Sequence, residues 1–160
     1  MDSDVLDRES RATVDDHRAL RLWLRLLTCS QLVERQVRRR LRERFATTLP
    51  RFDLLSQLER NPQGLKMGEL SRLLMVTGGN VTGIVDQLVK EGLVERVDDA
   101  ADRRAWRVRL TRAGERDFAA MAREHEAWVA GLLGGLTRKE SDALMQLLAR
   151  LKSVTLENSA

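Results

Sequence analysis

The segment from residue 80 to residue 110 changes from a helical to a strand-like pattern, and this change constrains the fold most strongly. Its first part places four apolar side chains on one helix face, at positions i, i+3, i+4 and i+7: Val81, Ile84, Val85 and Leu88. Gly92 follows, where such a helix is expected to end. Residues 93–97 and 106–110 have the pattern of two strands, and the second alternates apolar and basic side chains. With a short helix expected at about residues 67–74, this order predicts a winged helix-turn-helix over residues 49–111.

Longer helices are expected on both sides of this segment. Residues 16–45 keep near-helical apolar spacing without Gly or Pro, and Pro50 marks the start of a second helix. Residues 61–64 (Asn-Pro-Gln-Gly) form a turn signal. Thr111 is an expected N-cap for another long helix. The Gly134-Gly135 pair should end that helix, and the spacing of Thr137 and Glu140 predicts a capping box for a last one.

The predicted fold class is therefore mainly α with a small β-hairpin wing (α+β). The helical regions that flank the winged helix-turn-helix span residues 16–48 and 112–155. Residues 1–15 are expected to form a disordered acidic N-terminus, and residues 156–160 a C-terminal tail.

Composition narrows the class of protein. The 160-residue chain is 42% hydrophobic and 32% charged, and no apolar run approaches the roughly 18 residues of a membrane span. Its start is polar and acidic, unlike a signal peptide. The single cysteine, Cys29, excludes an internal disulfide and is typical of a reducing compartment, so we expect a cytoplasmic protein with no membrane partner. A net charge of +4 favours a polyanionic partner.

The basic residues are concentrated in two places. Six arginines lie within residues 34–44 and five within residues 103–112. The second group follows the expected wing tip, where an arginine could enter the narrow minor groove of DNA and others could neutralise phosphates. An aspartate two residues away could hold that arginine's guanidinium group. We therefore expect the wing to bind DNA through four residues: Asp102, Arg103, Arg104 and Arg107.

The expected helix at residues 80–90 supplies the second predicted DNA contact. Gly83 falls on its exposed side, where a glycine costs about 1 kcal/mol relative to alanine. Neither a cap nor side-chain packing is expected to explain this glycine, so we expect close approach of the backbone to DNA. The predicted contacts in and before this helix are glycines and polar side chains that can approach or hydrogen-bond bases or phosphates: Thr77, Gly79, Asn80, Thr82, Gly83, Gln87 and Lys90.

Three motifs in this region resemble the MarR family of transcriptional regulators. They are residues 81–88 (VTGIVDQL), residues 91–96 (EGLVER), and residues 102–104 (DRR) with 108–111 (VRLT) and Gly114. The resemblance extends over residues 20–152. It implies an obligate homodimer held by the flanking helices, which binds a palindromic operator in double-stranded DNA. It further implies repression until a small ligand or an oxidant releases the protein, with Arg104 as the minor-groove arginine and Asp102 as its partner.

Two kinds of release signal remain open. The first is a small aromatic or phenolic acid or its CoA thioester, bound between the dimerisation helices and the DNA-binding domain. The candidate residues are aromatic side chains and the arginines of residues 34–44: Trp23, Arg38, Arg39, Arg42, Phe45, Phe52 and Trp128. The same aromatic residues could instead belong to the core, and the arginines could form dimer salt bridges or contact the DNA backbone. The second signal is oxidation of Cys29, which we expect to be buried among its apolar neighbours.

Other functions find less support in the sequence. No nucleophile–base pair, phosphate-binding loop or histidine–cysteine cluster is apparent, so we expect neither an enzyme nor a cofactor or metal site. A helical interaction protein without DNA binding remains an alternative, although it leaves the basic hairpin unexplained.

Overall fold

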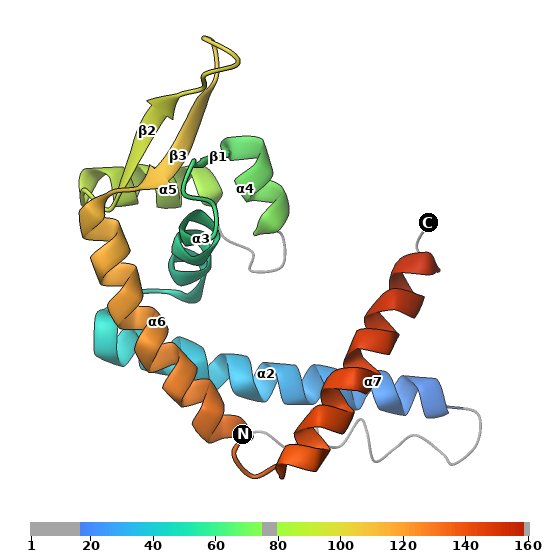
Figure 1. Cartoon of the computed structure of the whole chain (residues 1–160). Helices are drawn as coiled ribbons and strands as arrows, with labels where there is room; N and C mark the ends of the chain where they lie inside the picture. Colours follow the sequence, from blue (N-terminus) through green and yellow to red (C-terminus); the bar gives the residue numbers. More distant parts are fainter. Residues whose placement is uncertain (1–16, 75–79, 159–160) are drawn as a thin grey trace. The chain divides into compact units, whose positions relative to one another are not determined.

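The computed structural model describes residues 17–74 and 80–158 (Figure 1). The chain forms two compact units, one ending at Glu126 and the other beginning at Ala127. Its helices and strands follow in this order: α2 (Arg18–Phe45), α3 (Leu49–Glu59), β1 (Leu65–Lys66), α4 (Met67–Leu73), α5 (Val81–Lys90), β2 (Val94–Asp98), β3 (Trp106–Leu110), α6 (Arg112–Leu133) and α7 (Arg138–Glu157). This is the predicted mainly α fold with a winged helix-turn-helix.

Helices α2 and α3 begin and end where the local sequence predicts. Helix α2 runs without interruption to Phe45 and ends at Ala46, which has a left-handed backbone (φ 49°). Two residues later Thr48 caps α3, because its Oγ1 accepts a hydrogen bond from the Arg51 N–H at 3.4 Å. Pro50 lies in the first turn of α3, where its missing N–H costs no helical hydrogen bond.

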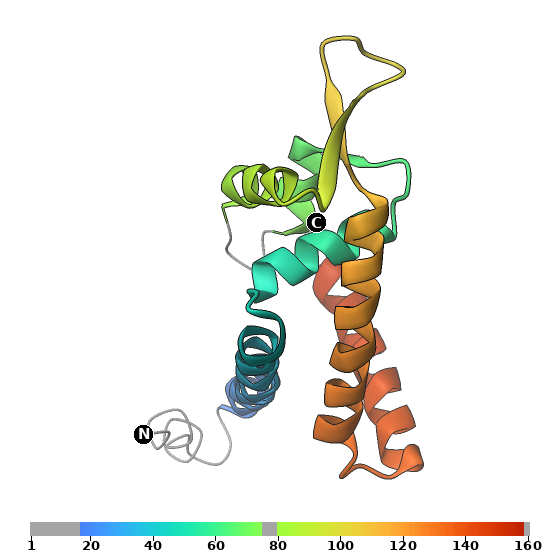
Figure 2. The same cartoon turned by 90° about the vertical axis from the view of Figure 1, so that its left-hand side faces the viewer.

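Three antiparallel strands form the sheet, in the order β1-β3-β2. Leu65 pairs with Val108, and Val94 pairs with Leu110. Gly64 precedes β1 with a φ of +84°, and a Cβ there would lie 2.7 Å from the Val108 carbonyl oxygen. The turn therefore requires a glycine. The strands β2 and β3 extend as a hairpin beyond α4 and α5 (Figures 1 and 2).

The core of the first unit lies between helices α3, α4 and α5 and the sheet. Each of these helices and strands, together with α2, contributes at least one buried aliphatic side chain, and each such side chain stabilises the fold by roughly 1.5–3 kcal/mol. The fully buried members are Leu41, Leu54, Leu55, Leu58, Leu70, Val85, Leu88, Val94 and Val108. This core fixes which face of α5 is turned toward solvent.

The second unit contains the end of α6 and helix α7. The predicted capping box is present, since Thr137 Oγ1 accepts from the Glu140 N–H at 3.3 Å and Glu140 Oε2 accepts from the Thr137 N–H at 2.8 Å. The Thr137 N–H and the Thr137 hydroxyl, which both donate to Glu140 Oε2 at 2.8 Å, lower the pKa of Glu140. Helix α7 has no buried residue, and its exposed apolar side chains are Leu144, Met145, Leu147, Leu148, Leu151, Val154 and Leu156. Among the described helices, none is both long and apolar enough to cross a membrane.

Candidate nucleic-acid interface

Helix α5 presents a polar face to solvent. Val85 and Leu88 are fully buried, which leaves Thr82, Gln87 and Lys90 exposed on other faces of the helix. These three are among the side chains that the sequence predicts as DNA contacts. Two further predicted contacts, Thr77 and Gly79, lie outside the described residues.

Asn80 and Gly83 have a structural relationship that the sequence analysis missed. Asn80 is the N-cap of α5, and its Oδ1 accepts from the Gly83 N–H at 3.2 Å. A Cβ at Gly83 would lie 3.0 Å from Asn80 Nδ2 and 3.3 Å from its Cγ. The expectation that neither a cap nor packing bears on this glycine is therefore wrong, because a Cβ there would crowd the Asn80 capping amide by a few tenths of an ångström.

Two arginines from other elements bind side chains in the middle and at the C-terminal end of α5. Arg96 of β2 pairs with Asp86 and lies 4.8 Å from the Trp106 ring centroid. Arg51 of α3 donates to Gln87 Oε1 at 3.4 Å and forms a two-pronged ion pair with Glu91. Helix α5 is thus held to the wing by one arginine and to α3 by the other.

The wing tip differs in detail from the predicted aspartate–arginine pair. Asp102 Oδ1 accepts from the main-chain N–H of Arg104 at 2.9 Å. Within the described residues no bond joins the Asp102 carboxylate to the Arg104 guanidinium group. Asp102 therefore fixes the backbone of the tip, and the side chains of Arg103 and Arg104 are exposed.

Asp99 lies directly after β2, where the tip loop of the wing begins, and its bonds were not predicted. It is buried, with a relative exposure of 4%, and its carboxylate accepts from the Ala101 N–H at 2.8 Å. Lys66 Nζ and Arg107 Nε each lie 3.1 Å from its Oδ2. The Ala101 hydrogen bond, then the Lys66 bond and the charges of both cations, lower the pKa of Asp99 to about 2.

Arg107, which was expected to neutralise DNA phosphates, has partners within the chain. Its guanidinium group binds Asp99 and donates to the Gly64 carbonyl at 3.1 Å. These bonds join the wing to the turn before β1, and the phosphate contact stays a prediction. The hairpin register, which places Asp99 beside Ala105 through a 3.1 Å backbone hydrogen bond, would have indicated this pairing.

The predicted effector residues do not converge on one site. Arg38 pairs with Glu34 at 2.6 Å, and Arg39 donates to Gln36 at 2.7 Å, while Arg42 is exposed. Trp23 is 56% exposed, and it precedes Arg38 by fifteen residues of the same helix, or roughly 22 Å along the axis.

The remaining aromatic candidates have different surroundings. Phe45 is half-buried at the end of α2, and Trp128 belongs to the second unit. Phe52 is a core residue, since its ring centroid lies 5.5 Å from that of Phe118 and 4.6 Å from that of His125. Burial lowers the pKa of His125.

Asp53 follows Phe52 on α3 and is the most perturbed carboxyl group of this region. Burial raises the pKa of Asp53 to about 6; the positive charge of Arg38 opposes this shift and the negative charge of Glu34 adds to it. This carboxyl group therefore titrates at a pH of about 6, within the electrostatic influence of Arg38 and Glu34 of α2.

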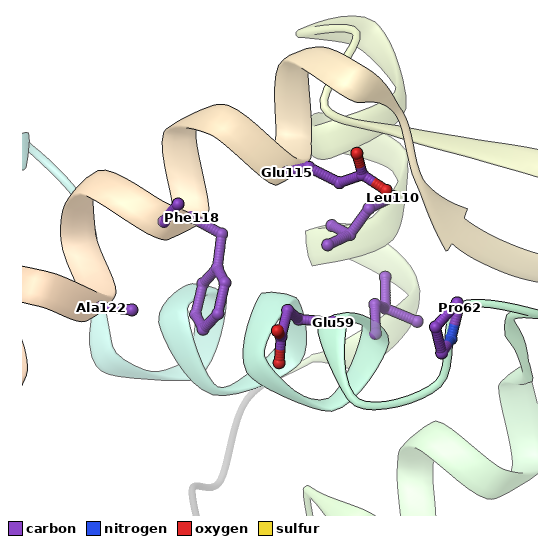
Figure 3. Close-up of a pocket in the computed structure, with 8 residues that line it drawn as sticks. Glu59, Pro62, Leu110, Glu115, Phe118 and Ala122 are labelled. Carbon is purple, nitrogen blue, oxygen red and sulfur yellow. The ribbon is translucent and has the colours of Figure 1, made fainter.

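A pocket of about 400 Å³ lies between α3 and α6, at a different place (Figure 3). It is lined by Leu58, Glu59, Pro62, Leu110, Glu115, Phe118, Ala119 and Ala122. No predicted effector residue contributes to it, and its charged side chains are two carboxylates rather than arginines.

Two further expectations concern oxidation and metals. Cys29 is exposed on α2, so the expectation of a buried thiol is wrong. Burial had been inferred from apolar neighbours in sequence; Leu26, Leu32 and Val33 do share the helix face of Cys29, but none of them is buried within this chain. Within residues 17–74 and 80–158, no group of three histidine, cysteine or carboxylate side chains could hold a metal ion.

Comparisons with known proteins agree with this architecture. A family profile described as MarR family matches residues 47–105. The crystal structure of a MarR-family transcriptional regulator from Silicibacter pomeroyi is 34% identical, covers 89% of this chain and 99% of its own, and superposes with a TM-score of 0.72. AbsC, a MarR-family regulator from Streptomyces coelicolor, shares the fold at 20% identity, with a TM-score of 0.73 and coverage of 92% and 99%. The transcriptional activatory protein BadR from Rhodopseudomonas palustris is 27% identical over 83% of this chain and 77% of its own length. This chain therefore belongs to the MarR family of winged-helix transcriptional regulators.

Proposed function

We propose that this regulator binds a palindromic DNA operator as a homodimer, with α5 in the major groove and the wing tip in the minor groove. The observation that carries the proposal is that α5 and the wing, which share one hydrophobic core, both expose polar or basic side chains. Helix α5 exposes Thr82, Gln87 and Lys90, while the wing exposes Arg103 and Arg104. A helix of this kind fits a major groove about 12 Å wide.

The two arginines of the wing have different proposed roles. Asp102 fixes the backbone at Arg104 through its main-chain N–H, which reduces the conformational freedom that binding would otherwise remove. Arg104 then enters the minor groove, where the negative potential favours a guanidinium group. Arg103 neutralises a phosphate, a contact that carries no sequence information by itself.

Exposed apolar side chains on the flanking helices support the homodimer. The large apolar side chains of α7 are exposed, and α2 also exposes Leu20, Leu22, Trp23 and Leu32. Apolar surface of this extent is typical of a protein–protein interface. A dimer with twofold symmetry requires an operator with matching half-sites about one helical turn apart.

For the sign of regulation we propose repression, which the family resemblance implies, although the relative BadR is named as an activatory protein. A promoter–reporter fusion tests this directly. Deletion of the regulator is expected to raise reporter expression, and a fall in expression would assign activation instead.

We further propose that an aromatic or phenolic acid, or its CoA thioester, releases the operator. Arg38, Arg39 and Arg42 near the end of α2 supply positive charge for a carboxylate or phosphate, and the half-buried Phe45 follows them on the same helix. The exposed Cys29 supports the redox alternative. If Cys29→Ser abolishes release by peroxide, oxidation is the signal; if the variant still responds to an acid, the ligand proposal stands.

Selection from a randomised duplex library tests the DNA-binding proposal. The wild-type protein is expected to enrich inverted repeats whose half-sites are centred about 10 base pairs apart. Enrichment of single asymmetric sites would contradict the homodimer, and no enrichment at low salt would contradict DNA binding.

A further inference from the structure

Arg51 connects the start of α3 to the end of the recognition helix. Its side chain is only 18% exposed, although it carries a full charge. Its Nε donates to Thr47 Oγ1 at 3.2 Å, and Thr47 is itself buried at the α2–α3 junction. Its two terminal nitrogens bind the two carboxylate oxygens of Glu91, the C-cap residue of α5.

This arrangement fixes the guanidinium group from both sides. The arginine backbone is part of the α3 N-cap, because its N–H donates to Thr48 Oγ1. The Thr47 contact then sets the plane of the guanidinium group, and the planar fork matches the Glu91 carboxylate at two points. A rotation of α5 about its axis would break both contacts with Glu91 at once.

The same arginine also orients Gln87. An arginine can only donate hydrogen bonds, so the Gln87 atom that faces Arg51 at 3.4 Å is the carbonyl oxygen. The NH2 group of the same amide takes no part in this contact, and the Gln87 side chain is exposed on α5. Gln87 is thereby set to donate to an acceptor, such as guanine O6 or N7, thymine O4 or a phosphate oxygen.

We infer that Arg51 is a positioning residue, which sets the orientation of helix α5 and presents Gln87 to DNA as a hydrogen-bond donor. This inference rests on the proposed DNA binding. It adds that a residue outside the recognition helix controls sequence preference, through Thr47 on one side and Glu91 on the other.

Fluorescence anisotropy with two labelled duplexes tests the inference. One carries the inverted repeat selected by the wild-type protein, and the other is a scrambled duplex of the same composition. Arg51→Ala is expected to weaken binding to the selected duplex at least about fivefold and to change scrambled-duplex affinity less than twofold. The double variant with Glu91→Ala is expected to be no weaker than Arg51→Ala alone, because the two residues act through one contact.

Arg44 supplies a matched control, since it forms a two-pronged ion pair with Glu124 at 3.0 Å that does not involve α5. Arg44→Ala is expected to leave the ratio of the two affinities unchanged. An unchanged ratio in Arg51→Ala would overturn the inference. So would equal weakening on both duplexes with a salt slope reduced by about 1, which is the signature of a direct phosphate contact.

Hydrogen exchange of the DNA-free protein separates this inference from the proposed function. Arg51→Ala is expected to accelerate amide exchange in the last turn of α5, whereas Arg44→Ala is not. If the wild-type protein binds no DNA, the proposed function fails while this measurement still decides whether Arg51 holds the helix. Unchanged exchange in α5 would show that it does not.

Discussion

Replacing Gly114 with alanine tests how the start of α6 is joined to the sheet. Gly114 is buried in the first turn of α6, and an added Cβ would lie 1.9 Å from the Leu93 carbonyl oxygen. That is about 1.5 Å short of an ordinary contact, and the obstacle is backbone rather than a flexible side chain. The Leu93 oxygen also accepts from the Thr111 N–H at 3.1 Å, so moving it weakens that bond as well.

The expected cost combines two effects. Overpacking of a buried site typically costs 1–3 kcal/mol, and losing one backbone hydrogen bond costs roughly 0.5–1.5 kcal/mol. We therefore expect Gly114→Ala to lower the free energy of unfolding by about 2–4 kcal/mol. In a chain of this length, the melting temperature should fall by roughly 5–15 °C.

Circular dichroism during thermal and urea unfolding measures this loss, with all variants at one protein concentration because a dimer's stability depends on it. Gly131→Ala is the matched control in the same helix, since a Cβ there meets nothing within 4 Å. This control is expected to stabilise the helix by up to about 1 kcal/mol. If Gly114→Ala is as stable as the wild type, the packing of α6 against Leu93 is not as described.

Three further predictions concern charged groups. Because the folded pKa of Asp53 is raised to about 6, the free energy of unfolding should fall as pH rises from about 4 to 6. At pH 7.5 the free energy of unfolding of Asp53→Asn should exceed that of the wild type by about 1 kcal/mol, a value reduced because the site is half-exposed. Urea titrations should show that the variant loses this advantage below pH 4. Asp99, whose pKa is lowered to about 2, should stabilise the wing fully above about pH 4 and lose this effect as pH falls through 2. Asp99→Asn should therefore accelerate hydrogen exchange in β2 and β3 at pH 7. Unchanged exchange would exclude an anchoring role for Asp99. Arg103→Ala should weaken binding to all duplexes equally and reduce the salt slope by about 1, whereas Arg104→Ala should weaken the selected duplex most; identical behaviour of the two variants would contradict their separate roles.

Local patterns predicted most of the elements. The apolar repeat from Val81 to Leu88 located α5, and the strict alternation of residues 106–110 located β3 at its observed bounds. Strand β1 was missed because two residues carry no periodicity. It exists only because Leu65 and Lys66 pair with β3, which is a tertiary contact.

The interactions that hold the interface in place were not visible in the sequence. The Asp99–Arg107 pair depends on the register of the hairpin, and the Arg51–Glu91 pair joins residues 40 positions apart. Likewise, Trp23 and Arg38 were both assigned to the predicted effector site, although fifteen residues of α2 separate them. Charge clusters in sequence therefore predicted where DNA would bind, but the partner of each arginine required the fold.

The most direct test of the DNA-binding account is the salt dependence of affinity, measured by anisotropy on the selected and scrambled duplexes. The account predicts that the logarithm of affinity falls linearly with the logarithm of salt concentration on both, because basic side chains displace counterions from phosphates. It also predicts at least about 1,000-fold tighter binding to the selected duplex at physiological salt. Equal affinity for the two duplexes, or affinity that does not change with salt, would contradict it.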